Sequence, residues 1–424
     1  MRSLHFVAAL LAATAPLSAQ DAPHAHDPAR ATPLFTAHGG ASAILAAVRV
    51  EPGVAGRTLA EGYVTQPMLH GTFGIGRRIE LRATVNFEGA TLKRGELTPG
   101  IYGEGYVDRR HPHTWLHELV ASFRTPSWHG ASASLSGGKG FAPFGTDDPM
   151  SRPLLRYPVN HHLAQILERA FLSGAVRWRG VAIEGALFNG DEPESPSDAP
   201  NAVNFGDSWS SRLTLWPLRG IELQGSIGRV LSPESPLGIG FDHQRRHASA
   251  RVERTVGAQE VYALVELART DLEWFSERAF RLTSVLAEAS ASRGIFTVAA
   301  RYERTTRPEE ERLLNPFRTP FPTAEVHVLG LTRIAVTTAA VSARASIRGV
   351  AVSPFVEASL MRARETVSPA AFVPLEFYGR NPVAALSAGI RLGLGGTHPR
   401  MGRYGVAAAA VTRALAPGEH SSHH

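Results

Sequence analysis

The most regular stretch of the chain is an unbroken alternation of apolar and polar residues between Ile79 and Glu88. Every odd position from 79 to 87 is apolar, and every even position from 80 to 88 is polar or charged. Successive side chains of a β-strand point to opposite faces, so a period of two indicates a strand between two unlike environments. One face of this strand meets an apolar medium and the other a polar one.

Similar segments recur along most of the chain and predict about 16 strands. We expect strands at 41–50, 68–76, 79–88, 115–124, 130–138, 171–178, 181–188, 211–216, 221–229, 248–255, 260–268, 280–291, 295–304, 326–336, 350–361 and 383–394. The stretch 337–349 is compatible with an extra strand or with a long turn. Short turns alternate with long loops along the chain, as in outer-membrane barrels, where turns are periplasmic and loops extracellular.

These features predict an all-β fold: a transmembrane antiparallel β-barrel of 14 to 18 strands. A soluble sandwich or propeller is the alternative, but no blade repeat of about 40 to 50 residues is present. The apolar positions must then face lipid, because polar groups are not solvated in hydrocarbon. The opposite positions would line the interior as a charged wall: Glu80, Arg82, Glu184, Glu222, Gln224, Arg251, Glu253, Arg301, Glu303 and Glu357.

Composition agrees with a barrel, in which only alternate strand residues face lipid. The chain of 424 residues is 43% hydrophobic and 19% charged, and it has no cysteine. We expect a signal peptide at 1–19, a flexible periplasmic lead at 20–40, the barrel at 41–395 and a C-terminal extension at 396–424. The extension would be either a periplasmic tail or a further strand. Arginines are scattered singly, so the net charge of +6 does not predict nucleic-acid binding.

Four loop motifs resemble a family of uncharacterised bacterial outer-membrane barrels. They are Val107 to His113 (VDRRHPH, followed by Glu118-Leu119), Pro158 to His162 (PVNHH), Phe188 to Pro193 (FNGDEP) and Leu231 to Glu234 (LSPE). The resemblance covers roughly residues 35–395. It implies a porin-like barrel and raises the question of metal, because members are often found beside heavy-metal and copper resistance systems. Two departures reduce the ligand set: Thr114 replaces the usual Asp, and 163–168 lacks the usual Asp and His.

The histidines of the first two motifs form the candidate metal site. His111, His113, His161 and His162 would supply nitrogen ligands suited to Cu or Zn. The alternative, which we prefer, is a hydrogen-bonded clamp between two loops that also uses Asp108 and Arg109. No nucleophile elbow or H-E-x-x-H spacing is present, so we expect no enzyme activity and no required cofactor.

The sequence therefore favours a porin-like channel for passive diffusion of small hydrophilic solutes across the outer membrane. The excess of arginine makes anions the better guess for the permeant species. Two alternatives stay open: a barrel that handles Cu or Zn through its loop histidines, and a plugged barrel that acts as a structural or interaction scaffold. The expected partners are outer-membrane lipid and solutes, and a homo-oligomer is left open.

Overall fold

A computed structural model of the chain describes residues 34–51, 58–91, 114–146, 149–193, 196–199, 202–233, 240–310, 328–366, 373, 375, 381–395 and 400–408. Its strands are β1 (Phe35–Glu51), β2 (Leu59–Ile75), β3 (Ile79–Asn86), β4 (Leu116–Arg124), β5 (Ala131–Gly140), β6 (Arg169–Trp178), β7 (Val181–Phe188), β8 (Ser208–Leu218), β9 (Ile221–Val230), β10 (Asp242–Val256), β11 (Gln259–Trp274), β12 (Glu277–Arg293), β13 (Phe296–Glu310), β14 (Val328–Ala343), β15 (Ala345–Ile347), β16 (Val350–Glu365) and β17 (Val383–Gly395).

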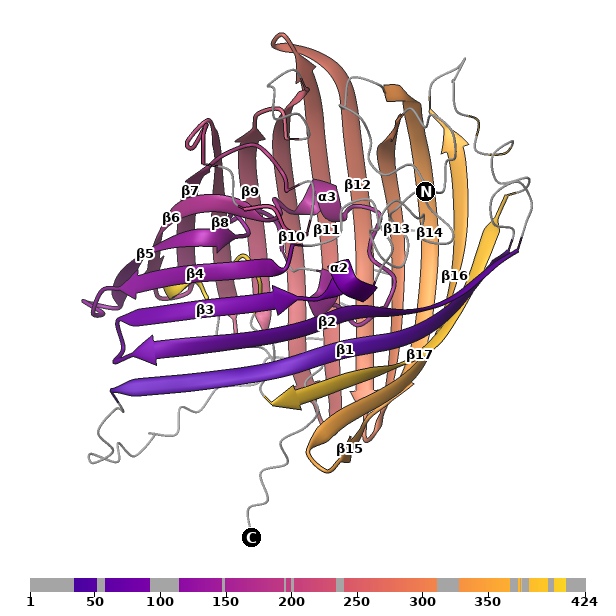
Figure 1. Cartoon of the computed structure of the whole chain (residues 1–424), viewed down its shortest axis with the longest axis horizontal. Helices are drawn as coiled ribbons and strands as arrows, with labels where there is room; N and C mark the ends of the chain where they lie inside the picture. Colours follow the sequence, from indigo (N-terminus) through magenta and orange to yellow (C-terminus); the bar gives the residue numbers. More distant parts are fainter. Residues whose placement is uncertain are drawn as a thin grey trace. The chain divides into compact units, whose positions relative to one another are not determined.

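The described strands form one closed antiparallel sheet (Figure 1). Apart from β14 and β15, each strand pairs with the next one in sequence, and β17 closes the sheet by pairing with β1. The short β15 continues β14 beyond Arg344, and both pair with β16. The 17 strands therefore occupy 16 strand positions around the barrel, which we call staves. The predicted barrel and strand number are confirmed. Residues 337–349 hold no additional stave: they complete β14 and β15 and turn into β16.

The strands differ in length between the two halves of the barrel. Strands β3 to β9 have 8 to 11 residues, whereas β10 to β14 have 15 to 17. The sequence placed a loop between 268 and 280, but β11 and β12 form one long hairpin with a two-residue turn at Phe275 and Ser276. Both turn residues have positive φ, +47° and +67°, as the turn that best fits a twisted hairpin requires.

The outer surface of the barrel is apolar, as expected. On β3, β7 and β13 the residues Leu81, Ile183 and Val298 are exposed, while their sequence neighbours on the other face are buried or, at Glu80, half-buried. A closed sheet leaves no edge with unpaired backbone groups, and an apolar outer belt is compatible only with lipid. The protein is an outer-membrane β-barrel.

The four short helical segments among the described residues are α2 (Glu88–Thr91), η2 (Pro149–Ser151), α3 (His161–Ala164) and η4 (Gly405–Ala407). None of the described helices is long and apolar enough to cross a membrane. Helix α3 lies in the β5–β6 connection, residues 141–168, and η4 lies in the C-terminal segment, residues 400–408. Both stretches carry buried residues that contact the inward-facing side chains of the strands.

Candidate functional site in the barrel lumen

Charged side chains of both signs are concentrated inside the barrel. Among the described residues, ten basic and nine acidic side chains are buried there: Arg82, Lys139, Arg152, Arg156, Arg169, Arg212, Arg245, Arg251, Arg301 and Arg403, with Glu88, Glu118, Glu168, Glu184, Glu222, Glu266, Glu288, Glu303 and Glu357. A buried charge is costly unless it is paired and hydrogen-bonded. The near balance of signs therefore indicates an interior of ion pairs rather than a field of one sign.

The middle of the β5–β6 connection is held by carboxylates of the opposite wall. Glu357 of β16 accepts hydrogen bonds from the backbone N–H groups of Leu155 and Arg156, at 2.6 and 3.0 Å. Glu303 of β13 accepts from the N–H of Val159 at 2.6 Å. Carboxylates that accept from backbone amides make strong, charge-assisted bonds. These two glutamates hold the connection inside the barrel.

Wall arginines complete this frame by donating to carbonyls of the connection. Arg391 of β17 donates to the carbonyl of Pro153 at 2.9 Å. Arg245 of β10 donates to the carbonyls of His162 and Gln165 at 2.9 and 2.8 Å. The charged side chains of the wall on this side therefore form hydrogen bonds with the backbone of the inserted loop. The N–H and C=O groups of its irregular stretches have no partner in a helix or sheet and need such bonds.

The end of the connection is fixed by a buried cluster around Glu168. Its carboxylate lies 2.9 Å from Nδ1 of His117 on β4 and 3.0 Å from Nζ of Lys139 on β5, and the hydroxyl of Thr114 donates to it. His117 and Glu168 are both buried. The chain therefore returns from the lumen to β6 through an anchor that bridges two strands and the preceding connection.

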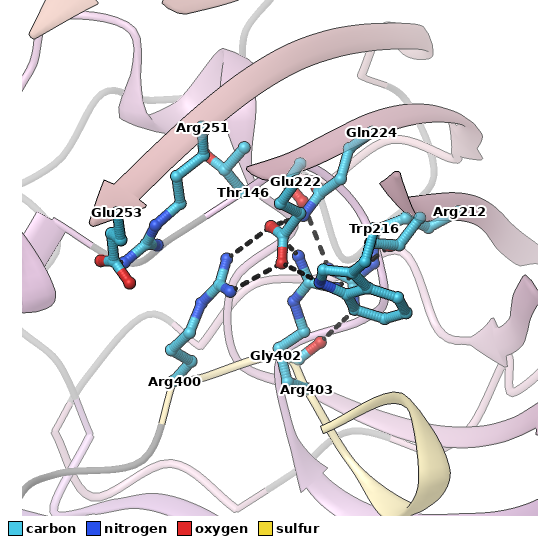
Figure 2. A network of polar contacts seen from close by, with 12 residues as sticks. Thr146, Arg212, Trp216, Glu222, Gln224, Arg251, Glu253, Arg400, Gly402 and Arg403 are labelled. Carbon is cyan, nitrogen blue, oxygen red and sulfur yellow. Dashed lines mark hydrogen bonds and ion pairs between the residues drawn. The ribbon is translucent and has the colours of Figure 1, made fainter. Parts of the chain in front are cut away.

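The C-terminal segment is bound on the other side of the lumen, against β3 to β9. Figure 2 shows its centre: Glu222 of β9 accepts from Arg400 through both carboxylate oxygens, each at 2.9 Å, and from Arg403 at 3.0 Å. Arg82 of β3 donates to the carbonyl of Arg403 at 2.9 Å. The segment thus exchanges hydrogen bonds with the wall in both directions.

Tyr404 anchors the same segment to β4 and β6. Its hydroxyl donates to Glu118 at 2.7 Å, and its ring stacks on Phe171 with centroids 5.1 Å apart. Burial raises the pKa of Tyr404 well above its ordinary value, and the nearby Glu118 carboxylate raises it further. The hydroxyl therefore stays protonated and remains a donor.

The two inserted segments also contact each other. Arg212 of β8 donates to the carbonyls of Gly145 and Gly402, at 3.2 and 2.6 Å, and is itself paired with Glu184 at 2.6 Å. The N–H of Phe141 donates to the Tyr404 hydroxyl at 3.1 Å. One wall arginine and one tyrosine therefore couple the connection to the C-terminal segment.

The ten residues assigned to the charged wall all point to the interior, in two groups. Five contact an inserted segment: Arg82, Glu222, Arg301, Glu303 and Glu357. The other five form hydrogen bonds with other side chains of the strands: Glu80, Glu184, Gln224, Arg251 and Glu253. That they line a solute path stays a prediction.

The histidine site is described only in part. His111, His113, Asp108 and Arg109 lie outside the described residues. His161 and His162 are adjacent in α3 with ring centroids 4.1 Å apart, and Nδ1 of His161 lies 3.2 Å from the carbonyl oxygen of Pro158. Among the described residues, no three His, Asp or Glu side chains are grouped to hold a metal ion. Binding of Cu or Zn stays a prediction.

Sequence reasoning did not single out several residues of the site. Arg212, Glu266 and Glu288 occupy inward positions of the period-two pattern and could have been added by extending it. Arg400, Arg403 and Tyr404 could not, because they follow the last strand and belong to no repeat. The C-terminal extension was expected to be a tail outside the barrel or a strand; residues 400–408 are neither and are held in the lumen.

Comparisons with known proteins return structures only. No protein-family model and no curated protein matches the chain. The anion-selective porin from Comamonas acidovorans is similar with a TM-score of 0.49 and 8% identity, over 85% of this chain and 100% of that one. The outer-membrane protein OmpT of Vibrio cholerae also scores 0.49 at 8% identity, over 86% and 99%. OccK2 of Pseudomonas aeruginosa scores 0.37 at 12% identity, over 84% and 98%.

Proposed function

We propose that this protein is an outer-membrane channel for small hydrophilic solutes whose lumen is narrowed by two inserted segments. The observation that carries the proposal is the polar, charged interior of a closed 16-stave barrel. A barrel of this size is wide enough to hold an aqueous channel. A barrel that served only as a rigid scaffold would have no need of so many charges, because an apolar core is less costly to bury.

Polar groups without protein partners support a hydrated interior. The side-chain amide atoms of Asn160 and Asn189 are buried and have no hydrogen-bond partner within the described part of the chain, and neither have the hydroxyls of Thr338 and Ser387. Buried polar atoms in folded proteins are satisfied by protein or by water. Water between the inserted segments and the wall would provide the path for a small solute.

The near balance of buried charge bears on selectivity. A lumen lined by one sign of charge raises the local concentration of the opposite ion, whereas alternating signs cancel over a few ångströms. With ten basic and nine acidic residues buried inside the described barrel, we expect a weak preference at most. The anion preference inferred from the sequence stays a prediction, with a small expected magnitude.

Planar-bilayer recordings of the purified full-length protein test the channel. The wild type should show small, resolvable conductance steps. The double variant Arg400→Gln/Arg403→Gln removes both cations that bind Glu222 and should give larger steps, because the C-terminal segment leaves the lumen more often. The matched control Arg293→Gln/Arg348→Gln changes two arginines at the short turns and should conduct like the wild type.

The filled lumen also favours a second candidate, a plugged barrel that serves as a scaffold. In the described barrel the two segments contact strands on both sides of the lumen, which is what a permanent plug requires. Under this alternative the wild type and the arginine variants are all silent in bilayers while remaining folded. That result would overturn the channel function.

A further inference from the structure

The outer face of the barrel carries a row of arginines near the end with the long loops. We define the arginine belt by one residue on each of seven strands: Arg229, Arg246, Arg269, Arg281, Arg304, Arg333 and Arg362. On each strand the belt arginine lies at one end of a run of outward-facing residues that are mostly apolar or small. On β13, for example, the outward positions Phe296, Val298 and Tyr302 precede Arg304.

The belt belongs to only one part of the barrel. On β3 to β8 no outward-facing described residue is charged. Near the end with the long loops, their outward positions hold side chains such as Leu119, Leu187 and Trp209. A general rule that barrels end their apolar belt with a positive charge would place arginines on these strands too. The one-sided distribution indicates a specific contact along β9 to β16.

Three of the seven belt arginines pair with described carboxylates of the protein, and four do not. Asp242 pairs with Arg229 at 3.1 Å, and Asp271 is shared between Arg269 and Arg281 at 2.6 and 2.7 Å. Arg246, Arg304, Arg333 and Arg362 have no carboxylate partner among the residues that the structure describes. These four cations therefore project from the edge of the apolar surface with their charge uncompensated.

Two cross-strand pairs place like charges directly opposite each other. Arg246 on β10 is in register with Arg269 on β11, and Arg333 on β14 is in register with Arg364 on β16. Like charges directly opposite on neighbouring strands destabilise a sheet. At the first pair Arg269 is bound by Asp271, at 2.6 Å. At the second pair an anion between the two guanidinium groups would remove the repulsion, and a phosphate matches the geometry of their donors.

We propose that the arginine belt is a docking surface for phosphate groups of a membrane lipid in the leaflet at the long-loop side. Outward-facing strand residues at the edge of the apolar belt meet lipid headgroups, and a surface arginine attracts an anionic headgroup strongly. The apolar run below each arginine accommodates the acyl chains of the same lipid. The lipid would cover β9 to β16 and leave β3 to β8 with ordinary, exchanging neighbours.

Native mass spectrometry of the full-length protein in detergent tests this proposal, with purified bisphosphorylated lipid A as the probe. The wild type should retain the lipid. Arg246→Gln/Arg304→Gln should weaken retention about tenfold or more, since each cation near an anionic surface contributes substantially. The control Arg254→Gln/Arg293→Gln removes two arginines from the opposite ends of the same group of strands and should retain the lipid like the wild type.

Two further arms separate phosphate recognition from other causes. Arg246→Lys/Arg304→Lys keeps the charge and should restore most of the retention, which a purely structural defect would not allow. Lipid A stripped of its phosphates should bind the wild type as weakly as it binds the Gln variant. Equal retention by the Gln variant and the control, or equal binding of the phosphate-free lipid, would overturn the proposal.

Discussion

The two sides of the lumen hold their inserted segments in different ways. On the side of β3 to β9, the C-terminal segment is bound mainly through the side chains of Arg400, Arg403 and Tyr404. On the opposite side, the β5–β6 connection is bound mainly through its backbone, by Glu303 and Glu357. Among the described residues, the first segment has a strand on its N-terminal side only, and the second lies between two strands, β5 and β6.

This difference assigns different roles to the two segments. A loop tethered at both ends explores little space when one bond is lost, because its ends remain closed by the strands. A segment that is not followed by a described strand gains more conformational entropy when its contacts are lost. We therefore expect the connection to be a permanent constriction and the C-terminal segment to be the part that can leave.

The largest effect is expected for Glu222→Gln. The substitution removes the charge that the buried Arg403 shares with the half-buried Arg400, and an uncompensated buried charge costs about 3 to 5 kcal/mol. The C-terminal segment should leave the lumen, conductance should rise, and trypsin should cleave after Arg400 or Arg403 in the folded barrel. Unchanged conductance and full protection from trypsin would show that the segment does not depend on this pair.

Gly145→Ala should disturb the other segment at its start. Gly145 has φ +67°, and a Cβ atom there would lie 1.6 Å from the carbonyl oxygen of Ala164. We expect the free energy of unfolding to fall by about 3 kcal/mol, from left-handed backbone and overpacking together. The control Gly76→Ala has a similar φ of +56° but nothing within 4 Å of the added atom. Its thermal unfolding midpoint should fall much less, and equal losses would refute the steric argument.

Tyr404→Phe is expected to weaken the C-terminal segment moderately. It deletes the hydrogen bond to Glu118, worth about 1.5 to 3 kcal/mol for a charged acceptor, and retains the ring that stacks on Phe171. Trypsin cleavage after Arg403 should become detectable but slower than in Glu222→Gln. Tyr302→Phe, on the lipid-facing surface, is the control and should be protected like the wild type.

The smallest effect is expected for Glu357→Gln on the opposite side. The amide oxygen of Gln can still accept one of the two N–H groups of Leu155 and Arg156, and the connection remains tethered at both ends. We expect a loss of about 1 kcal/mol in the free energy of unfolding and conductance steps of wild-type size. A conductance increase as large as that of Glu222→Gln would abolish the distinction between the two sides.

The sequence by itself determined the barrel, the number of staves and the face that meets lipid. These follow from a period-two pattern, because a closed sheet in a bilayer forces unlike surroundings on its two faces. The same pattern also predicts that Arg82, Glu222 and Glu357 lie on the inner face. It also underestimated the lengths of β11 and β12, since polar residues such as Thr270 and Asp271 continue a strand beyond the apolar belt.

Only the tertiary structure decided what the inner face contacts. A carboxylate such as Glu357 has the same sequence signature whether it meets water or the backbone of a loop 201 residues away in the chain. Likewise, the segment from Arg400 to Ala408 has no periodicity that would direct it into the lumen. Its position depends on the convergence of Arg82, Arg212 and Glu222 from three strands, and such convergence exists only once the sheet has closed.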